Sequence, residues 1–275
     1  MKKARKALSV LLAALLLLSL CSVFASAGAQ HRYLVLGDSI GLGSGISNPD
    51  QACFGRIVAN TNGYEYANDA VNGHRTVDLL GRLQEAGVIS HVQWADIISV
   101  SIGGNNFLRG NMTSMIAQIQ AGNYAIVDEI VAGVATDLDA IVARIRSLNP
   151  NAAILLQTLY NPAPSASLTP VYQQAIDRLN AVIKACAANA DALVDVETAF
   201  AANNELISWD NIHPNAAGNV VIAREVLKTL KAMGLGTETE PVIATAGRDW
   251  APTGPAVLLR KILTFFLRFF SQLFK

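Results

Sequence analysis

Three side chains in the sequence have the types and spacing that nucleophilic catalysis requires. Ser39 lies in the segment LGDSIGLGSG, directly after the apolar residues 33–36, whereas Asp210 and His213 lie far along the chain. A serine hydroxyl becomes a good nucleophile when a base accepts its proton, and the base needs a third group that fixes its tautomer. We therefore predict that Ser39 is a nucleophile, His213 its general base and acid, and Asp210 the group that orients His213.

Such a nucleophile also needs hydrogen-bond donors for the negative oxygen of a tetrahedral intermediate. The side-chain amide of Asn105 and the backbone N–H groups of Gly73 and Ser39 are candidates for this oxyanion hole. Taken alone, Asp38 and Ser39 also fit a helix cap, because both residue types favour that position. His213 alone also fits a surface histidine. The presence of all the required residue types together favours a catalytic site.

The apolar pattern around these residues predicts short buried strands that alternate with helices. The expected strands are residues 32–37, 95–104, 152–159 and 192–196, and the expected helices are 51–61, 77–86, 125–148, 170–190 and 216–233. This alternation predicts a three-layer α/β/α domain with a mainly parallel sheet and right-handed crossovers. In such sheets the ligand site lies beyond the carboxyl ends of the strands. Ser39 and residues 103–106 each follow a predicted strand, and residues 209–215 lead into the last helix.

Four segments, in the order LGDSI, NDAVNGHRT, GGNN and DNIHP, resemble the sequence blocks of the SGNH hydrolase (GDSL esterase/lipase) superfamily. The resemblance covers about residues 32–233 and is greatest to secreted thioesterases, lysophospholipases and arylesterases. It implies a flavodoxin-like sheet and a serine ester hydrolase that works through an acyl-serine intermediate, without a metal or other cofactor. It also implies the catalytic and oxyanion-hole roles given above.

Two positions depart from the superfamily pattern. Ile40 stands where leucine is usual, a change of similar volume that should cost little. Asn106 stands where aspartate is usual, and an amide keeps hydrogen bonding but loses the charge. This second change puts in question how firmly the neighbouring loop is held. We also expect residues 109–125 to shape the substrate pocket.

The N-terminal segment predicts export. Residues 1–28 contain four basic residues near the start, then an apolar run, then small residues with an A-x-A arrangement at 25–27, as in a cleaved signal peptide. An uncleaved membrane anchor is the alternative, because the apolar run is almost long enough to span a bilayer. We predict a hydrolase domain at 29–235 and a Gly/Thr/Pro-rich linker at 236–255.

Residues 256–275 predict a basic amphipathic helix. At 100° per residue its polar side chains share an arc of about 120°, and the apolar residues from 262 onward all lie outside this arc. Such a helix lies in a membrane interface, or it packs back on the domain. The expected membrane-contacting residues are Arg260, Lys261, Phe265, Phe266, Arg268, Phe269 and Phe270. Together with the N-terminal signal, this helix predicts a secreted enzyme that is retained at the outer face of the cell membrane.

The charge distribution argues against a nucleic-acid partner. The first 28 and last 20 residues hold eight of the 21 basic residues and no acidic residue, so residues 29–255 carry a net charge of −8. The four histidines show no metal-ligand spacing. The sequence does not decide whether Cys53 and Cys186 are free or form a disulfide. We expect acyl esters of lipid, lysolipid or small size as substrates; the alternatives are a carbohydrate O-deacetylase and a catalytically inactive membrane-bound lipid-binding module.

Overall fold

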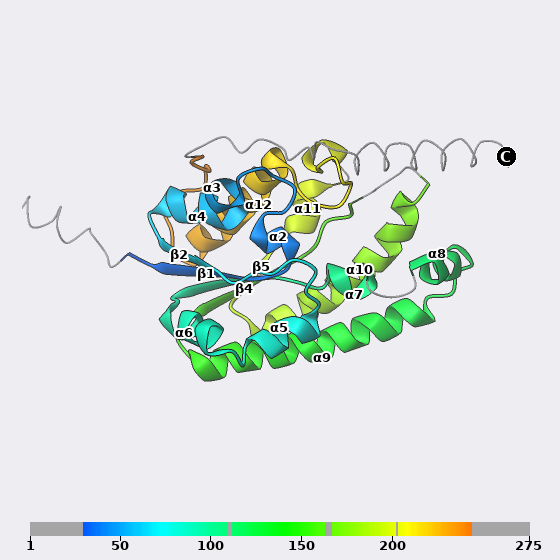
Figure 1. Ribbon diagram of the computed structural model, residues 1–275, viewed down its shortest axis with the longest axis horizontal. Helices are drawn as coiled ribbons and strands as arrows, with labels where there is room; N and C mark the ends of the chain where they lie inside the picture. Colours follow the sequence, from blue (N-terminus) through cyan, green and yellow to red (C-terminus); the bar gives the residue numbers. More distant parts are fainter. Residues whose placement is uncertain (1–29, 109–111, 163–166, 202, 244–275) are drawn as a thin grey trace, which may run out of the picture.

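A five-stranded parallel sheet forms the centre of the computed structural model, which describes residues 30–108, 112–162, 167–201 and 203–243. The strands are β1 (Arg32–Gly37), β2 (Glu65–Asn68), β3 (Ile97–Ser101), β4 (Ala153–Gln157) and β5 (Ala192–Val194). Their order is β2-β1-β3-β4-β5, and each neighbouring pair is parallel (Figure 1). This is the flavodoxin-like order, and the predicted fold class is confirmed.

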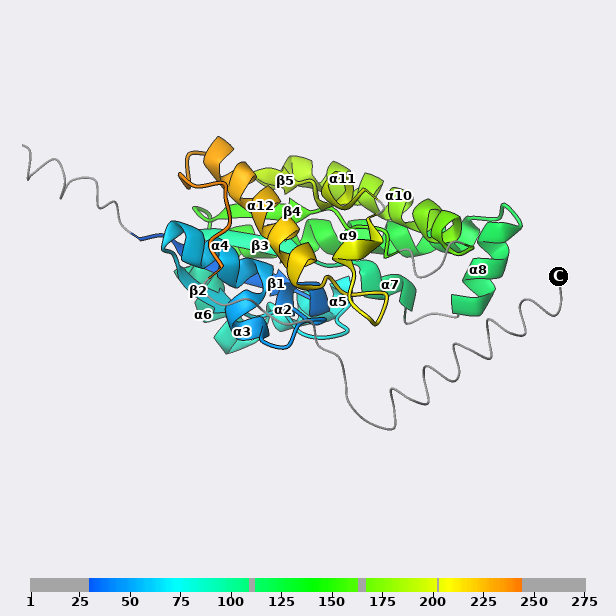
Figure 2. The same cartoon turned by 90° about the horizontal axis from the view of Figure 1, so that it is seen from above.

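Helices cover both faces of the sheet (Figure 1). One face carries α2 (Ser39–Leu42), α3 (Pro49–Ala52), α4 (Phe54–Asn62), α11 (Val196–Phe200) and α12 (Ala216–Ala232). The other carries α5 (Thr76–Arg82), α6 (Ala86–Trp94), α7 (Gly104–Leu108), α8 (Met112–Gln120), α9 (Ala125–Leu148) and α10 (Thr169–Cys186). Two short 3₁₀ turns, η1 (Ala187–Asn189) and η2 (Asn204–Leu206), complete the described elements. Figure 2 shows α7 and α8 at one end of the molecule, beyond the sheet.

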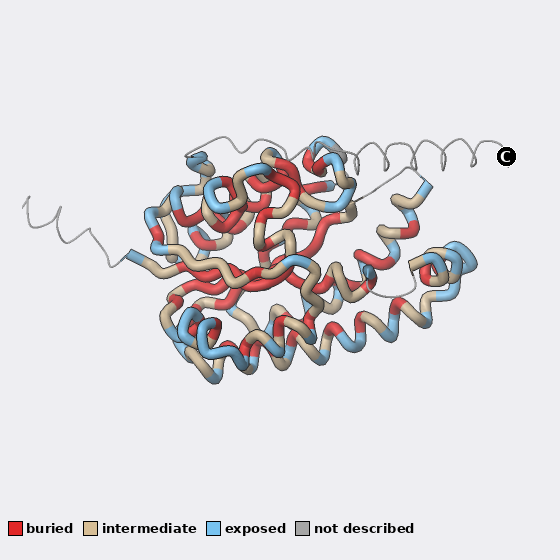
Figure 3. The backbone as a smooth tube through the Cα atoms, in the orientation of Figure 1, coloured by how far each residue is buried: buried red, intermediate tan, exposed pale blue. Residues whose placement is uncertain are grey.

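The strands supply two separate apolar cores because successive side chains point to opposite faces. In β1, Leu34 and Leu36 pack with α9 and α10, whereas Tyr33 and Val35 pack with α4 and α12. Both sides of the sheet are therefore buried, as Figure 3 shows. The 24-residue helix α9 contributes a buried stripe at helical spacing: Val127, Val131, Val134, Leu138, Ile141, Val142 and Ile145.

The sequence pattern missed the strand β2 and five helices: α2, α6, α7, α8 and α11. The strand β2 has the sequence EYAN and contains no fully buried residue, so it lacks the apolar run of a strand covered on both faces. The helices α6 and α8 have nine residues each and lie in the connections between predicted strands. The helix predicted at 77–86 ends at Arg82, and a separate helix begins at Ala86.

The described chain begins and ends at the same side of the molecule. The side chain of Gln30 donates a hydrogen bond to the carbonyl of Gly63, at the end of α4. The N–H groups of Thr237 and Glu238 donate to the Oδ1 atom of the adjacent Asn62, at 3.1 and 3.3 Å. The described part of the predicted linker, residues 236–243, is thus hydrogen-bonded to the end of α4. The predicted signal (1–28), the rest of the linker and the C-terminal helix (256–275) lie outside the described residues.

Among the helices within the described ranges, none combines the length and the hydropathy that a bilayer crossing needs.

At the end of β1, a single added methyl group on Gly37 should strongly lower the stability of the fold. Gly37 has φ of +145°, and a Cβ atom there would lie 2.0 Å from the carbonyl oxygen of Ser101 in β3. We expect Gly37→Ala to lower the free energy of unfolding by about 2 kcal/mol or more. Gly133→Ala is the matched control: it lies in α9 with no atom within 4 Å of the added Cβ, and it should raise stability by about 0.5–1 kcal/mol. Urea denaturation measures both, and equal stabilities would contradict this account of the strand end.

Candidate active site

Ser39 is the first residue of α2 and follows β1 after a single intervening residue. That residue, Asp38, caps the helix, because its Oδ1 atom accepts a hydrogen bond from the N–H of Ile40 at 3.0 Å. The cap is therefore provided by Asp38 and not by Ser39. The hydroxyl of Ser39, which lies at the carboxyl edge of the sheet, is therefore not used as a helix cap.

A tight turn before α12 brings Asp210 and His213 together. The Oδ1 atom of Asp210 accepts hydrogen bonds from the N–H groups of Ile212 and His213, both at 2.9 Å. Asn211, which lies between Asp210 and His213 in the chain, has a positive φ of 61°, which asparagine adopts more readily than most residues. The aspartate side chain thus closes the turn with one oxygen and keeps the other for the imidazole.

The three predicted side chains form one hydrogen-bonded line. His213 Nε2 lies 2.8 Å from Ser39 Oγ, and His213 Nδ1 lies 2.6 Å from Asp210 Oδ2. Burial acts to raise the pKa of Asp210, but the hydrogen bonds that it accepts from His213 and Ile212 outweigh burial and lower that pKa. An ionised Asp210 favours the imidazole tautomer with its proton on Nδ1, so Nε2 can accept the proton of Ser39.

Asn105 lies in the first turn of α7, directly after β3, and its side chain reaches the same site. Its Nδ2 atom donates to the carbonyl of His74 at 3.0 Å and faces Asp38 Oδ2 at 3.4 Å. Together with Ser39, Asn105 lines the cavity described below. Both hydrogens of the Asn105 amide thus have an acceptor in the structure.

Asn106, the departure from the superfamily pattern, holds its neighbouring loop through two hydrogen bonds. Its Oδ1 atom accepts from the N–H of Thr76 at 3.2 Å, and its Nδ2 atom donates to Thr76 Oγ1 at 2.9 Å. The Thr76 hydroxyl in turn donates to Asp137 Oδ2 of α9 at 2.5 Å. Although Asn106 lacks the charge of an aspartate, its amide both accepts and donates a hydrogen bond. These two bonds to Thr76 anchor the start of α5.

Gly73 lies in the loop that follows β2, with φ of +74°. This loop is tied to the end of β1 by a hydrogen bond from the N–H of Val71 to the carbonyl of Gly37 at 3.1 Å. Within the described part of the chain, the N–H groups of Gly73 and Ser39 make no hydrogen bond. Both N–H groups are therefore available to donate to a substrate, although Gly73 is not among the residues that line the cavity.

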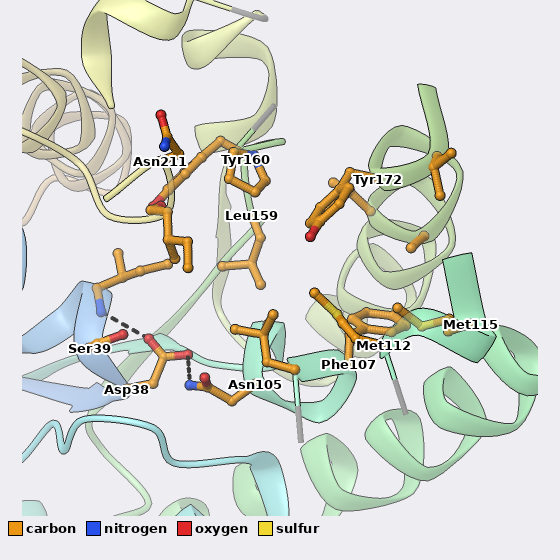
Figure 4. A pocket seen from close by; sticks show the side chains of 18 of the residues that line it. Asp38, Ser39, Asn105, Phe107, Met112, Met115, Leu159, Tyr160, Tyr172 and Asn211 are labelled. Carbon is orange, nitrogen blue, oxygen red and sulfur yellow. Dashed lines mark hydrogen bonds between the residues drawn. The ribbon is translucent and has the colours of Figure 1, made fainter. Parts of the chain in front are cut away.

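A cavity of about 240 Å³ lies beside Ser39 (Figure 4). Its polar lining residues include Ser39, Asp38, Asn105, Asp210 and Asn211. The rest of the wall is mostly apolar. Helices α7, α8 and α10 supply most of it, and α2 and two loops supply the remainder. The apolar lining residues are Ile40, Phe107, Leu108, Met112, Met115, Ile116, Ile119, Leu159, Pro162, Val171, Ala175, Ile176 and Ile212. Figure 4 shows Phe107, Met112 and Met115 on the side of the cavity away from Ser39.

Residues 109–125 were expected to shape the substrate pocket, and α8, within this range, lines the cavity beside Ser39. Residues 109–111 lie outside the described ranges. The contribution of α10 was missed. Its lining residues Val171, Ala175 and Ile176 have the same apolar spacing as the residues that face the core, so periodicity alone could not distinguish a cavity wall from packing.

Both cysteines of the described chain are free and buried. Cys53 contacts the hydroxyl of Tyr66 at 3.4 Å, and Cys186 belongs to the apolar core on the other face of the sheet. In the ranges that the structure describes, no three His, Cys, Asp or Glu side chains are grouped in a way that would hold a metal ion.

Asp38 makes stability depend on pH. Burial raises its pKa from 3.8 to about 7, so the folded chain keeps this proton at pH values where the unfolded chain has lost it. The contribution of Asp38 to the free energy of unfolding is fully present below pH 4 and is lost as the pH rises to about 7. The decrease is about 1.4 kcal/mol per pH unit at most.

The variant Asp38→Asn should lack this component. Urea denaturation at pH 4.5 and pH 7.5 measures the effect, and we expect the variant to gain stability relative to the natural chain at the higher pH. If the two proteins changed in parallel between these pH values, Asp38 would not hold its proton in the folded state.

Comparison with known proteins agrees with the resemblance seen in the sequence. Residues 35–221 match the model of the GDSL-like Lipase/Acylhydrolase family. The uncharacterized protein YpmR of Bacillus subtilis (strain 168) is 25% identical over 258 residues, which cover 84% of this chain and 98% of the relative.

Two solved structures share the fold. The lipase Lip_vut3 from a goat rumen metagenome superimposes with a TM-score of 0.62 and 22% identity, covering 75% of this chain and 99% of that one. The acetylxylan esterase Axe2 from Geobacillus stearothermophilus gives a TM-score of 0.56 and 22% identity, covering 78% and 97%. With more than half of its length matched by the family model, this chain belongs to the GDSL-like lipase/acylhydrolase family and is a serine ester hydrolase.

Proposed function

We propose that the enzyme hydrolyses esters whose acyl group is an apolar chain, through an acyl intermediate on Ser39. One observation carries this proposal: the Ser39 hydroxyl, 2.8 Å from His213 Nε2, borders a cavity with a predominantly apolar wall. In such a site the acyl chain enters the cavity and the ester carbonyl lies against Ser39.

The proposed reaction has two steps. Ser39 Oγ attacks the carbonyl carbon while His213 Nε2 takes the hydroxyl proton, and Asp210 stabilises the imidazolium. Asn105 and the N–H groups of Ser39 and Gly73 stabilise the oxyanion, then the alcohol leaves with the proton from His213. Water, deprotonated by His213, attacks the acyl-serine, and the carboxylic acid departs as the proton returns to Ser39.

The cavity lining favours this substrate over the carbohydrate O-deacetylase. An acetyl group has one methyl to bury, whereas thirteen apolar side chains line the cavity that borders Ser39. Leu108 and Ile212, both lining residues, also remain 39% exposed, so the apolar surface extends to the protein exterior. The hydrogen-bonded line of three side chains supports catalysis over the alternative of an inactive lipid-binding module. The proposed likeness to the thioesterase, lysophospholipase and arylesterase branch stays a prediction.

Acyl chain length tests the proposal. Each CH₂ group buried contributes about 0.8 kcal/mol, so kcat/KM on p-nitrophenyl esters should rise about fourfold per CH₂ beyond acetate until the cavity is full. Ser39→Ala should remove the activity at every length. Ile116→Trp, which fills part of the cavity from α8, should abolish the preference for longer chains and spare acetate. Gln120→Trp, exposed on the same helix, is the matched control.

A rate that peaks at acetate in the natural chain would favour the deacetylase. Absence of Ser39-dependent turnover at any length would favour the binding module.

We further propose that the enzyme is exported and held at the outer face of the cell membrane by residues 256–275. The support is sequence alone: a signal-like N-terminus and a C-terminal segment with four basic residues on one face and phenylalanines on the other. Anchoring at a membrane suits an enzyme that acts on acyl esters of lipids.

Deletion of residues 256–275 should move the enzyme from the membrane fraction to the soluble fraction, because the apolar face and its basic stripe are lost together. Hydrolysis of a soluble short-chain ester should stay unchanged. The control Gln272→Ala keeps both faces and should remain with the membrane. Retention of the deletion variant in the membrane fraction would refute the anchor, as would loss of turnover on the soluble ester.

A further inference from the structure

The amide nitrogen of Asn105 has two hydrogens and, in the structure, two acceptors. Nδ2 donates to the carbonyl of His74 at 3.0 Å and faces Asp38 Oδ2 at 3.4 Å. An oxyanion on the substrate would be a third acceptor for the same nitrogen. Because the His74 contact is the shorter of the two, the hydrogen directed at Asp38 is the one that is free to turn to the substrate.

Asp38 is nearly inaccessible, with 2% of its surface exposed, and it lines the cavity beside Ser39. Its Oδ1 atom accepts from the N–H of Ile40 at 3.0 Å. No Lys or Arg side chain in the described ranges forms an ion pair with it. The buried carboxyl thus lies next to the proposed oxyanion hole without a permanent cation to neutralise it.

The titratable groups around Asp38 come from three loops. His213 and Asp210 lie in the turn before α12, Tyr160 follows β4, and His74 lies before α5. Of these, a protonated His213 favours the charged form of Asp38, yet burial outweighs it and raises the pKa of Asp38 to about 7. Both charge states of Asp38 are therefore populated near neutral pH.

We propose that Asp38 is a positioning residue that controls the oxyanion hole through Asn105: the neutral acid leaves the Asn105 N–H to the substrate, and the carboxylate competes for it. The inference rests on the proposed function, which gives Asn105 its role as an oxyanion donor.

Two physical effects act in the same direction. A carboxylate accepts a stronger hydrogen bond from the amide than a neutral carboxyl does, so more free energy is lost when the amide turns to the substrate. A buried negative charge beside Asn105 also repels the oxyanion that forms in the same low-dielectric region. Together they lower kcat/KM by about tenfold when Asp38 ionises, which is the difference expected between a charged and a neutral hydrogen bond.

The decisive experiment is the pH dependence of kcat/KM, measured from pH 5 to pH 9 on one p-nitrophenyl ester with the full chain. In the natural enzyme the rate should fall above pH 7, by about tenfold, to a plateau. Asp38→Asn mimics the neutral acid and should lose this fall above pH 7.

Asn105→Ala separates positioning from a general effect of Asp38 and does not depend on the folding of the Asp38 variant. It should lower kcat by about 10²–10³, as for the loss of one oxyanion donor. The remaining activity should show a smaller fall above pH 7, because only the direct repulsion between the Asp38 carboxylate and the oxyanion is left. A flat profile above pH 7 in the natural enzyme would overturn the inference, and so would an undiminished fall in Asn105→Ala. Hydrolysis that survives Ser39→Ala would instead overturn the proposed function, so the two failures are distinguishable.

Discussion

The 2.8 Å hydrogen bond between His213 Nε2 and Ser39 Oγ joins residues that are 174 positions apart, and the arrangement of the site depends on it. The central strand β1 places Ser39, and the turn before α12 places His213. The segment after α2 is tied directly to the residues before this turn, because the hydroxyl of Ser208 donates a hydrogen bond to the carbonyl of Gly45 at 3.1 Å. Gly45 lies so close that a Cβ atom would be 2.8 Å from His213 Cβ. The bond is thus supported from both of its ends.

Two aspartates of the site acquire opposite properties from their surroundings. Asp210 accepts hydrogen bonds from two backbone N–H groups and from His213, and these lower its pKa despite partial burial. Asp38 is almost completely buried. Burial outweighs the hydrogen bond that it accepts from the N–H of Ile40 and raises its pKa to about 7. One aspartate can therefore serve as a permanent anion, whereas the other changes charge near neutral pH.

Sequence reasoning recovered the fold and the proximity of Ser39, Asp210 and His213, because these depend on local patterns. Buried strands that alternate with helices specify a parallel sheet, and such sheets gather the residues at their carboxyl ends. It missed the edge strand β2, whose residues are not deeply buried. It also missed the α10 wall of the cavity and the buried state of Asp38. Both depend on which segments pack against each other, and no local pattern encodes that.

The central claim, that Ser39 carries the acyl group during turnover, can be tested by trapping the intermediate. The full chain would be mixed with p-nitrophenyl octanoate, quenched in acid within milliseconds, digested and analysed by peptide mass spectrometry. The account predicts an octanoyl adduct on Ser39 and on no other residue, and none in Ser39→Ala. An adduct on a different side chain, or turnover by Ser39→Ala at the natural rate, would contradict it.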